Sequence, residues 1–174
     1  MNSSTATNIK ECEKPAEVLL MPVILWWRLL RDLRRRGGGV RESGAFLLGR
    51  RTSGRAKVLA YALYDDLEPT ALDTGIVILR SGGFKALWKR CRELRMDVVA
   101  DTHTHGDKHP QQSSIDKAHP LITTAGQISL ILPSFARTLG WKFRNVAVCE
   151  YTGNYSWRDW SGKQRKRRIQ FCLW

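Results

Sequence analysis

Two histidines and an aspartate stand close together in the second half of the chain. The stretch from Asp101 to Asp116 contains His103 and His105, two positions apart. At the end of a strand, side chains two residues apart project to the same face, so these two imidazoles can share one metal ion. Asp116 can supply a third ligand from the first turn of a following helix. Two imidazoles and one carboxylate leave the fourth tetrahedral position to water, as a catalytic zinc ion requires.

A serine at the right spacing adds to this pattern. Bound zinc would lower the pKa of a water towards about 7 and give a nucleophile at neutral pH. Ser113 stands three residues before Asp116, on the same face of the expected helix, so its hydroxyl can donate to a developing oxyanion. The same spacing is typical of a helix N-cap with an acid in the first turn, and the two roles are compatible.

The remaining histidines compete as ligands. His109 precedes Pro110 in the loop, and His119 precedes Pro120 at a helix end. We expect both to be structural or to lie outside the ligand set, with His109 the nearer to the site. A His-x-His pair alone is a weak sign of a metal, because both residues can equally be polar members of a loop.

Periodicity predicts the elements that position these residues. Apolar residues at three- and four-residue steps predict two main helices, and a short third helix is expected after the loop that follows the histidines. The first carries Val23, Trp26, Trp27, Leu30 and Leu33 on one face and ends at the glycines 37–39, the second carries Phe84, Leu87, Trp88, Cys91 and Leu94, and the third spans 113–119 and ends at Pro120.

Short apolar or alternating runs predict seven strands, with a loop at 65–69. They lie at 44–49, 57–64, 76–79, 98–100 (running into the histidines), 127–132, 142–150 and 169–173. The expected fold is α/β (α+β), with a mixed curved sheet of six or seven strands. The two main helices flank this sheet, and the short helix carries the Ser-x-x-Asp motif.

Length and composition favour one globular domain. The chain has 174 residues, of which 43% are hydrophobic. We expect a flexible polar leader at 1–15 and a single domain at 16–174, with a basic loop at 152–168. The formal net charge of +13 favours acidic partners and permits non-specific nucleic-acid binding.

The N-terminal sequence and the cysteines indicate a cytoplasmic, reduced protein that does not span a membrane. Residues 1–17 are polar and carry glutamates where a secretion signal needs positive charge. The apolar run 18–27 has half the length needed to cross a bilayer. No two of Cys12, Cys91, Cys149 and Cys172 form a CxxC pair, so a cysteine zinc ribbon is not expected.

The complete pattern resembles a known family. His-Thr-His, seven residues, and then Ser-Ser-Ile-Asp fit the His-x-His-x7-Ser-x-x-Asp signature of the JAMM (JAB1/MPN/Mov34) metallopeptidases. The family also has a glutamate upstream, before small and apolar residues, as Glu42 stands before residues 43–49. Five positions at defined spacing are more specific than any one of them. Over residues 18–150 the chain resembles the compact bacterial, Prok-JAB-type deubiquitinase-like branch.

The resemblance implies a cytidine-deaminase-like JAB/MPN fold and a zinc-dependent peptidase or isopeptidase. His103, His105 and Asp116 would hold one Zn2+, with water as the fourth ligand. Glu42 would take a proton from that water and deliver it to the leaving amine, and Ser113 would stabilise the tetrahedral intermediate. The family usually has proline after the second histidine, whereas Gly106 stands here. This departure concerns the loop shape rather than the ligands.

The family also suggests partners. Its members often cut after the C-terminal glycine of ubiquitin-like or sulfur-carrier proteins, in deconjugation or in precursor processing. Residues 126–136 look like the strand and turn of bacterial members encoded beside ubiquitin-activating-like enzymes, some of them in antiphage conjugation systems. The expected partners are therefore a ubiquitin-like protein or its conjugates, together with E1- and E2-like enzymes.

Two alternatives stay open: a nucleic-acid-associated, RadC-like protein on the same fold, and a non-catalytic scaffold MPN domain. The basic clusters lie at 34–36, 50–51 and 163–168, and Trp157 and Trp160 beside the last could stack on bases. These clusters could equally bind the acidic face of a ubiquitin-like protein or form a solvated surface. The scaffold is disfavoured because all five site residues are present. The first alternative predicts salt-sensitive DNA or RNA binding that survives Glu42→Ala.

Overall fold

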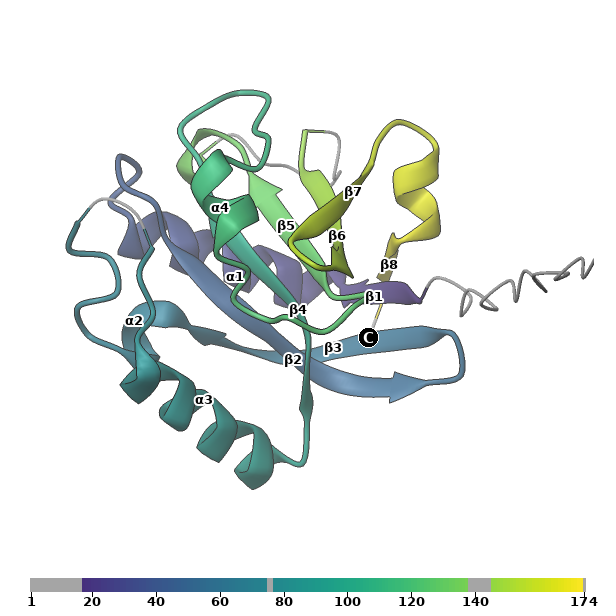
Figure 1. Cartoon of the computed structure of the whole chain (residues 1–174), viewed down its shortest axis with the longest axis horizontal. Coiled ribbons are helices and arrows are strands. Elements are labelled where there is room, and N and C mark those ends of the chain that lie inside the picture. The colour runs from purple at the N-terminus through teal and green to yellow at the C-terminus, as the bar shows by residue number, and fades with distance from the viewer. Residues whose placement is uncertain (1–16, 75–76, 138–144, 174) are drawn as a thin grey trace, which may run out of the picture.

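A curled mixed β-sheet forms the centre of the computed structural model, which describes residues 17–74, 77–137 and 145–173 (Figure 1). Within these residues the sheet has eight strands, in the order β7-β6-β5-β4-β2-β3-β1-β8. Their bounds are β1 Val18–Pro22, β2 Gly44–Thr52, β3 Arg55–Leu63, β4 Asp97–Thr104, β5 Ile128–Leu132, β6 Ala147–Gly153, β7 Ser156–Trp160 and β8 Ile169–Cys172. β1 is parallel to β3 and β8, β4 is parallel to β5, and the other pairs are antiparallel. The predicted α+β class with a mixed sheet is confirmed.

Helices lie on both faces of this sheet (Figure 1). The α-helices are α1 Val23–Arg36, α2 Tyr64–Leu67, α3 Ser81–Leu94 and α4 Ser114–Ala118, and two 3-10 turns are η1 Ser134–Ala136 and η2 Gln164–Arg167. α1 packs on one face in a core with Leu47 and Val58, and α3 packs on the other in a core with Phe46 and Leu48. The central strand β2 therefore contributes alternate residues to both cores.

The two main helices form where periodicity predicts them. Trp26, Leu30 and Leu33 of α1 are buried as expected, but Trp27 is 37% exposed and Leu29 takes its place in the core. Trp88 of α3 was also predicted to be buried and is 43% exposed. In both cases one tryptophan lies at the margin of the apolar stripe. The wide indole can meet solvent there while the adjacent aliphatic residues fill the core.

The glycine run ends α1 as predicted. Gly37 is still right-handed, and its N–H donates to the carbonyl of Leu33. Gly38 and Gly39 take the left-handed conformation, with φ of +60° and +70°, which glycine adopts without a steric penalty. Three arginines in the last turn face the negative end of the helix dipole. The chain then turns back to start β2.

Three strand predictions need correction. β1 and β7 were not predicted, so a count of six or seven strands was too low for the described chain. The strand predicted at 76–79 is wrong for the described residues 77–79, which belong to no strand. β1 was missed because its five residues continue directly into the apolar face of α1 and Pro22 is the only break between them. The segment 77–79 is apolar because it packs against the core around α3.

Two loop predictions also change. The expected loop at 65–69 begins as the short helix α2, and the expected basic loop at 152–168 contains β7 and η2. The predicted leader 1–15 lies outside the described residues. None of the helices in the described ranges is long and apolar enough to cross a membrane. Cys91, Cys149 and Cys172 are free thiols.

Candidate metal centre

A bulge in β4 sets the face on which both histidines lie. The register between β4 and β2 shifts by one residue between Leu47 and Leu48, where Val99 is the extra residue. A bulge of this kind reverses the alternation of side chains beyond it. Val98 packs in the core beneath α3, and His103 lies on that same face although it is five positions further on. His105 follows at the next alternate position.

Gly44 makes room for the floor of the site. It pairs with His103 across the β2–β4 ladder. A Cβ on Gly44 would lie 2.2 Å from a ring carbon of Tyr64 and 2.6 Å from the carbonyl oxygen of Thr102. The missing side chain lets the Tyr64 ring pack against the strand beside the histidines. Glycine is required here for space rather than for backbone conformation.

The capping box of α4 orients Asp116. The amide N–H of Asp116 donates to the Ser113 hydroxyl at 3.1 Å, and the Ser113 N–H donates to Asp116 Oδ2 at 2.8 Å. Both halves of the cap are therefore present, as the spacing predicts. In this arrangement the Ser113 hydroxyl uses a lone pair, so it retains its hydrogen for donation to another group.

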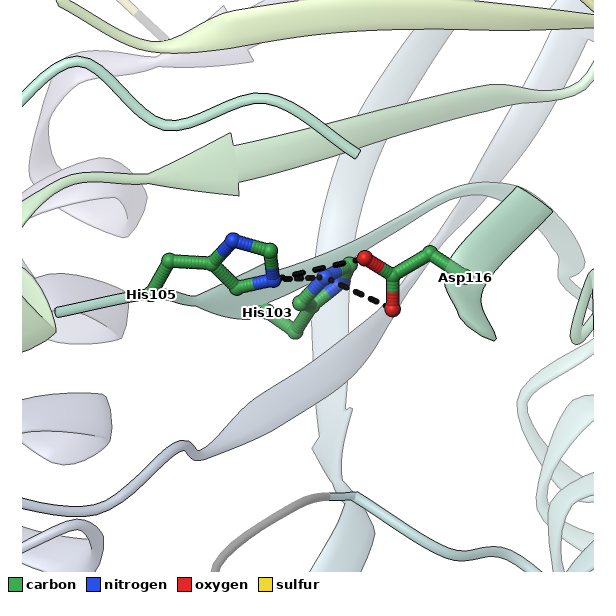
Figure 2. A group of neighbouring side chains, drawn as sticks. All are labelled: His103, His105 and Asp116. Carbon is green, nitrogen blue, oxygen red and sulfur yellow. Dashed lines mark hydrogen bonds and ion pairs between the residues drawn. The ribbon is translucent and has the colours of Figure 1, made fainter. Parts of the chain in front are cut away.

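The predicted ligands converge (Figure 2). The Nε2 atoms of His103 and His105 are 3.0 Å apart, and they lie 3.5 Å and 3.4 Å from the Asp116 carboxylate oxygens. Bonds of 2.0–2.1 Å at tetrahedral angles give ligand-to-ligand edges of about 3.3–3.4 Å, so the three side chains match the spacing of a zinc site. Both histidines are 8% exposed, while the Asp116 side chain is 22% exposed.

Glu42 lies beside this group. Its Oε1 is 3.7 Å from His105 Nε2, and its carboxylate accepts a hydrogen bond from the backbone of Val77. The group that can hold a metal consists of the two histidines and Asp116 without Glu42. Glu42 therefore stands within reach of the centre as a carboxylate outside the ligand group, which suits a general base.

Burial and charge set the protonation of these groups. Burial raises the pKa of Glu42, although the two histidines oppose the shift. Burial also raises the pKa of Asp116, but hydrogen bonds to His103 and His105 outweigh it and hold the pKa well below its ordinary value. Burial lowers the pKa of His105. The hydrogen bond to Asp116 and the charge of Glu42 raise this pKa by more than burial lowers it, so the net shift is upward.

The centre opens into a cleft with a volume of about 510 Å³. Its polar floor includes Tyr64, Asp101, Gln112 and Ser129, which were not predicted as site residues. Asp101 is 5% exposed and accepts a 2.7 Å hydrogen bond from the Ser129 hydroxyl. Strand alternation could have identified Asp101, because positions 101, 103 and 105 share one face.

The walls of the cleft are mainly apolar. Residues 77–79 form part of one side, and Ile115, Leu121 and Trp157 also line the cleft. Both His109 and His119 are exposed, but only His119 lines the cleft, which does not support the expectation that His109 lies nearer to the site. His119 is the C-cap of α4, and Pro120 follows it.

An unusual turn shapes the loop after His105. Phe135 in η1 is left-handed, with φ of +51°, and its N–H donates to the His105 carbonyl at 2.8 Å. A Cβ on Gly106 would lie 2.9 Å from the Phe135 ring. A side chain at position 106 would therefore clash with the Phe135 ring.

The predicted basic clusters are partly neutralised. Arg36 bonds Asp65 at 2.5 Å and Asp66 at 2.7 Å, Arg51 pairs with Glu17, and Arg168 is buried against Glu150. The two tryptophans proposed for base stacking are also engaged. The indole N–H of Trp157 donates to the Lys117 carbonyl, and that of Trp160 donates to Glu150.

Two solved structures share this arrangement of elements. The solution structure of a protein from Desulfitobacterium hafniense aligns with a TM-score of 0.63 at 15% identity, over 89% of this chain and 93% of that one. A protein from Salinibacter ruber aligns with a TM-score of 0.53 at 18% identity, over 82% and 88% of the two chains. No known protein family matches the sequence in a family search. At these identities the likeness shows the fold alone.

Proposed function

We propose that this chain is a zinc-dependent peptidase or isopeptidase of the JAMM type, on a JAB/MPN fold. Its substrate would be a bond that follows the C-terminal glycine of a ubiquitin-like protein. The observation that carries this proposal is the convergence of two histidine Nε2 atoms and the Asp116 carboxylate at tetrahedral spacing, with Glu42 beside them. A purely structural cluster of two histidines and an aspartate would not need this further carboxylate in the lining of the cleft.

Each residue has a role that follows from its position. When bound, zinc would act as a Lewis acid and lower the pKa of the water that it binds towards about 7. Glu42 takes the proton from the attacking water and gives it to the leaving amine, since it is the carboxylate outside the ligand group. Ser113 donates its free hydroxyl hydrogen to the developing oxyanion. Val77 holds the Glu42 carboxylate through its backbone N–H.

The cleft supports a narrow peptide substrate. Residues 77–79 line one side of the cleft next to Glu42, and an extended peptide could lie along them. The volume of about 510 Å³ is enough to hold several residues of an extended tail. The glycine-ended tail is what the resemblance to the JAMM family suggests.

Glu42→Gln tests the mechanism. We expect the variant to retain one zinc ion per chain by elemental analysis, because Glu42 is outside the ligand group. Cleavage of a set of ubiquitin-like proteins fused through their last glycine to a reporter should fall about 100- to 10,000-fold, the range for loss of a general base. Asp116→Asn should lose zinc and activity together.

Two results would contradict the proposal. Purified protein that takes up no zinc rules out the ligand assignment. Glu42→Gln that cleaves at the wild-type rate rules out the proposed base, even if zinc is present.

A further inference from the structure

A second, larger cavity lies at the other end of β4. It has a volume of about 1110 Å³ and is lined by the second half of α3, the start of β4 and residues 124–127 before β5. Asp97 and Val98 border it, whereas His103 is five residues further along the strand. At about 3.3 Å per residue, His103 lies about 16 Å along the strand from Val98. The cavity is therefore separate from the metal centre.

Two ion pairs neutralise most of the acids in this cavity. Arg51 pairs with Glu17, and its Nη2 also donates to the Val98 carbonyl at 3.0 Å. Arg168 Nη2 lies 3.0 Å from Glu150 Oε1. Glu17 and Glu150 are therefore already neutralised by arginines of the same cavity.

The buried polar atoms left without a partner in this lining are both donors. Gln127 Nε2 and Arg168 Nε have no hydrogen-bond partner among the described residues. Gln127 is 3% exposed and Arg168 is fully buried. An unsatisfied buried donor is costly, and each unmatched N–H favours a ligand that brings acceptors. The floor of the cavity is thus suited to an anion rather than to a cation.

One face of α3 adds a flat apolar surface and two more positive charges. Trp88 and Arg92 are four residues apart and share one side of α3, Arg95 is the left-handed residue that caps this helix, and all three line the cavity. Neither arginine forms an ion pair with a described residue, and each is exposed at the cavity. Of the three acids that line the cavity, Asp97 is the one that forms no ion pair with a described residue.

We propose that this cavity binds a small organic phosphate with a flat apolar body, the class to which nucleotides belong. The phosphate would lie against Arg92 and Arg95, because guanidinium groups match phosphate oxygens in a paired geometry. The flat body would stack on the Trp88 indole, which is 43% exposed at the rim. Gln127 would donate to an acceptor of the ligand at the floor.

Calorimetric titration of the full chain with ADP tests this site. The protein is first stripped of metal with a chelator, so that phosphate oxygens cannot bind through zinc. We expect saturable binding of one ADP per chain at physiological salt. The double variant Arg92→Ala/Arg95→Ala should bind at least about tenfold more weakly. Arg90→Ala is the matched control, because Arg90 is an exposed arginine of the same helix outside the cavity.

Two further variants, titrated in the same way, test which part of the cavity binds which part of the ligand. Trp88→Ala should weaken ADP binding and leave inorganic pyrophosphate binding unchanged, because pyrophosphate has no flat body. Asp116→Asn should bind ADP as the wild type does, which separates this site from the metal centre. The proposal is overturned if ADP gives no saturable binding. It is equally overturned if Arg90→Ala weakens binding as much as the double variant does, since net charge alone would then explain it.

Discussion

Asp101 lies beside the metal centre, and its carboxyl is buried, so its negative charge is costly there. Burial raises its pKa to about 6, although the Ser129 hydrogen bond and His103 oppose the shift. The ordinary pKa of 3.8 applies in the unfolded chain. Above about pH 6 the carboxyl is charged in both states, so folding carries the full penalty of its burial. Below about pH 4 it is neutral in both states and the penalty disappears.

Asp101→Asn should therefore stabilise the metal-free protein in a pH-dependent way. Relative to wild type, the free energy of unfolding should rise by about 2–3 kcal/mol more at pH 7.5 than at pH 4, from a shift of about two pKa units. Urea unfolding at both pH values measures this difference. Asp97→Asn, an exposed acid at the start of the same strand, is the control. An equal effect of Asp101→Asn at both pH values would contradict the assignment.

Gly44 is a position where the neighbouring atoms leave no room for a side chain. Gly44→Ala would force a Cβ to within 2.2 Å of the Tyr64 ring and 2.6 Å of a backbone oxygen. We expect the free energy of unfolding to fall by about 1–3 kcal/mol, as for other overpacked sites. In Gly82→Ala the new Cβ meets nothing within 4 Å, and the change should be neutral or slightly stabilising in α3. Thermal unfolding of the two variants gives the comparison.

The sequence was sufficient to predict which side chains converge, but not what lies beneath them. The spacing of His103, His105 and Ser113-x-x-Asp116 predicted a cluster that the structure brings together. Tyr64 and Gln112 come from segments distant in sequence, and no local pattern connects them to the histidines.

At the scale of elements, the turn η1 and the loop after β4 act as one unit. Gly106→Pro would place ring atoms where the Phe135 side chain lies, so this change alone should lower stability and zinc content. Phe135→Gly removes the ring and also relieves a left-handed residue with φ of +51°. The double variant should then recover at least about 1 kcal/mol relative to the sum of the single changes. Urea unfolding of the wild type, the two single variants and the double variant gives a double-mutant cycle. Strictly additive changes in the free energy of unfolding would show that the two positions do not interact.

Elements with strong periodicity were predictable, and those defined by distant pairing were not. α1 and α3 have long apolar stripes and appear where predicted. β7 has no buried residue, and its existence depends on pairing with β6, which composition does not reveal. Residues 77–79 are apolar but pack beside the core without entering the sheet. Their hydrophobicity indicated that these residues pack against the core, but it could not show whether they also pair with a strand.

For the whole molecule, a bound metal should contribute directly to stability. The centre joins β4 to α4, and α4 has no fully buried residue to hold it in place. A ligand that binds only the folded state adds about 2.7 kcal/mol when its concentration is 100 times its dissociation constant. Zinc should therefore raise the thermal midpoint of the chelator-treated protein, and excess chelator should reverse the rise.

Two histidine variants make this whole-molecule test specific. His103→Ala should unfold at the same temperature with and without zinc, because the ligand group is broken. His109→Ala should keep the full shift, since His109 is exposed and outside the cluster. A midpoint that rises equally in wild type and His103→Ala would place the zinc elsewhere on the chain. Because the test measures stability rather than cleavage, its result does not depend on the substrate.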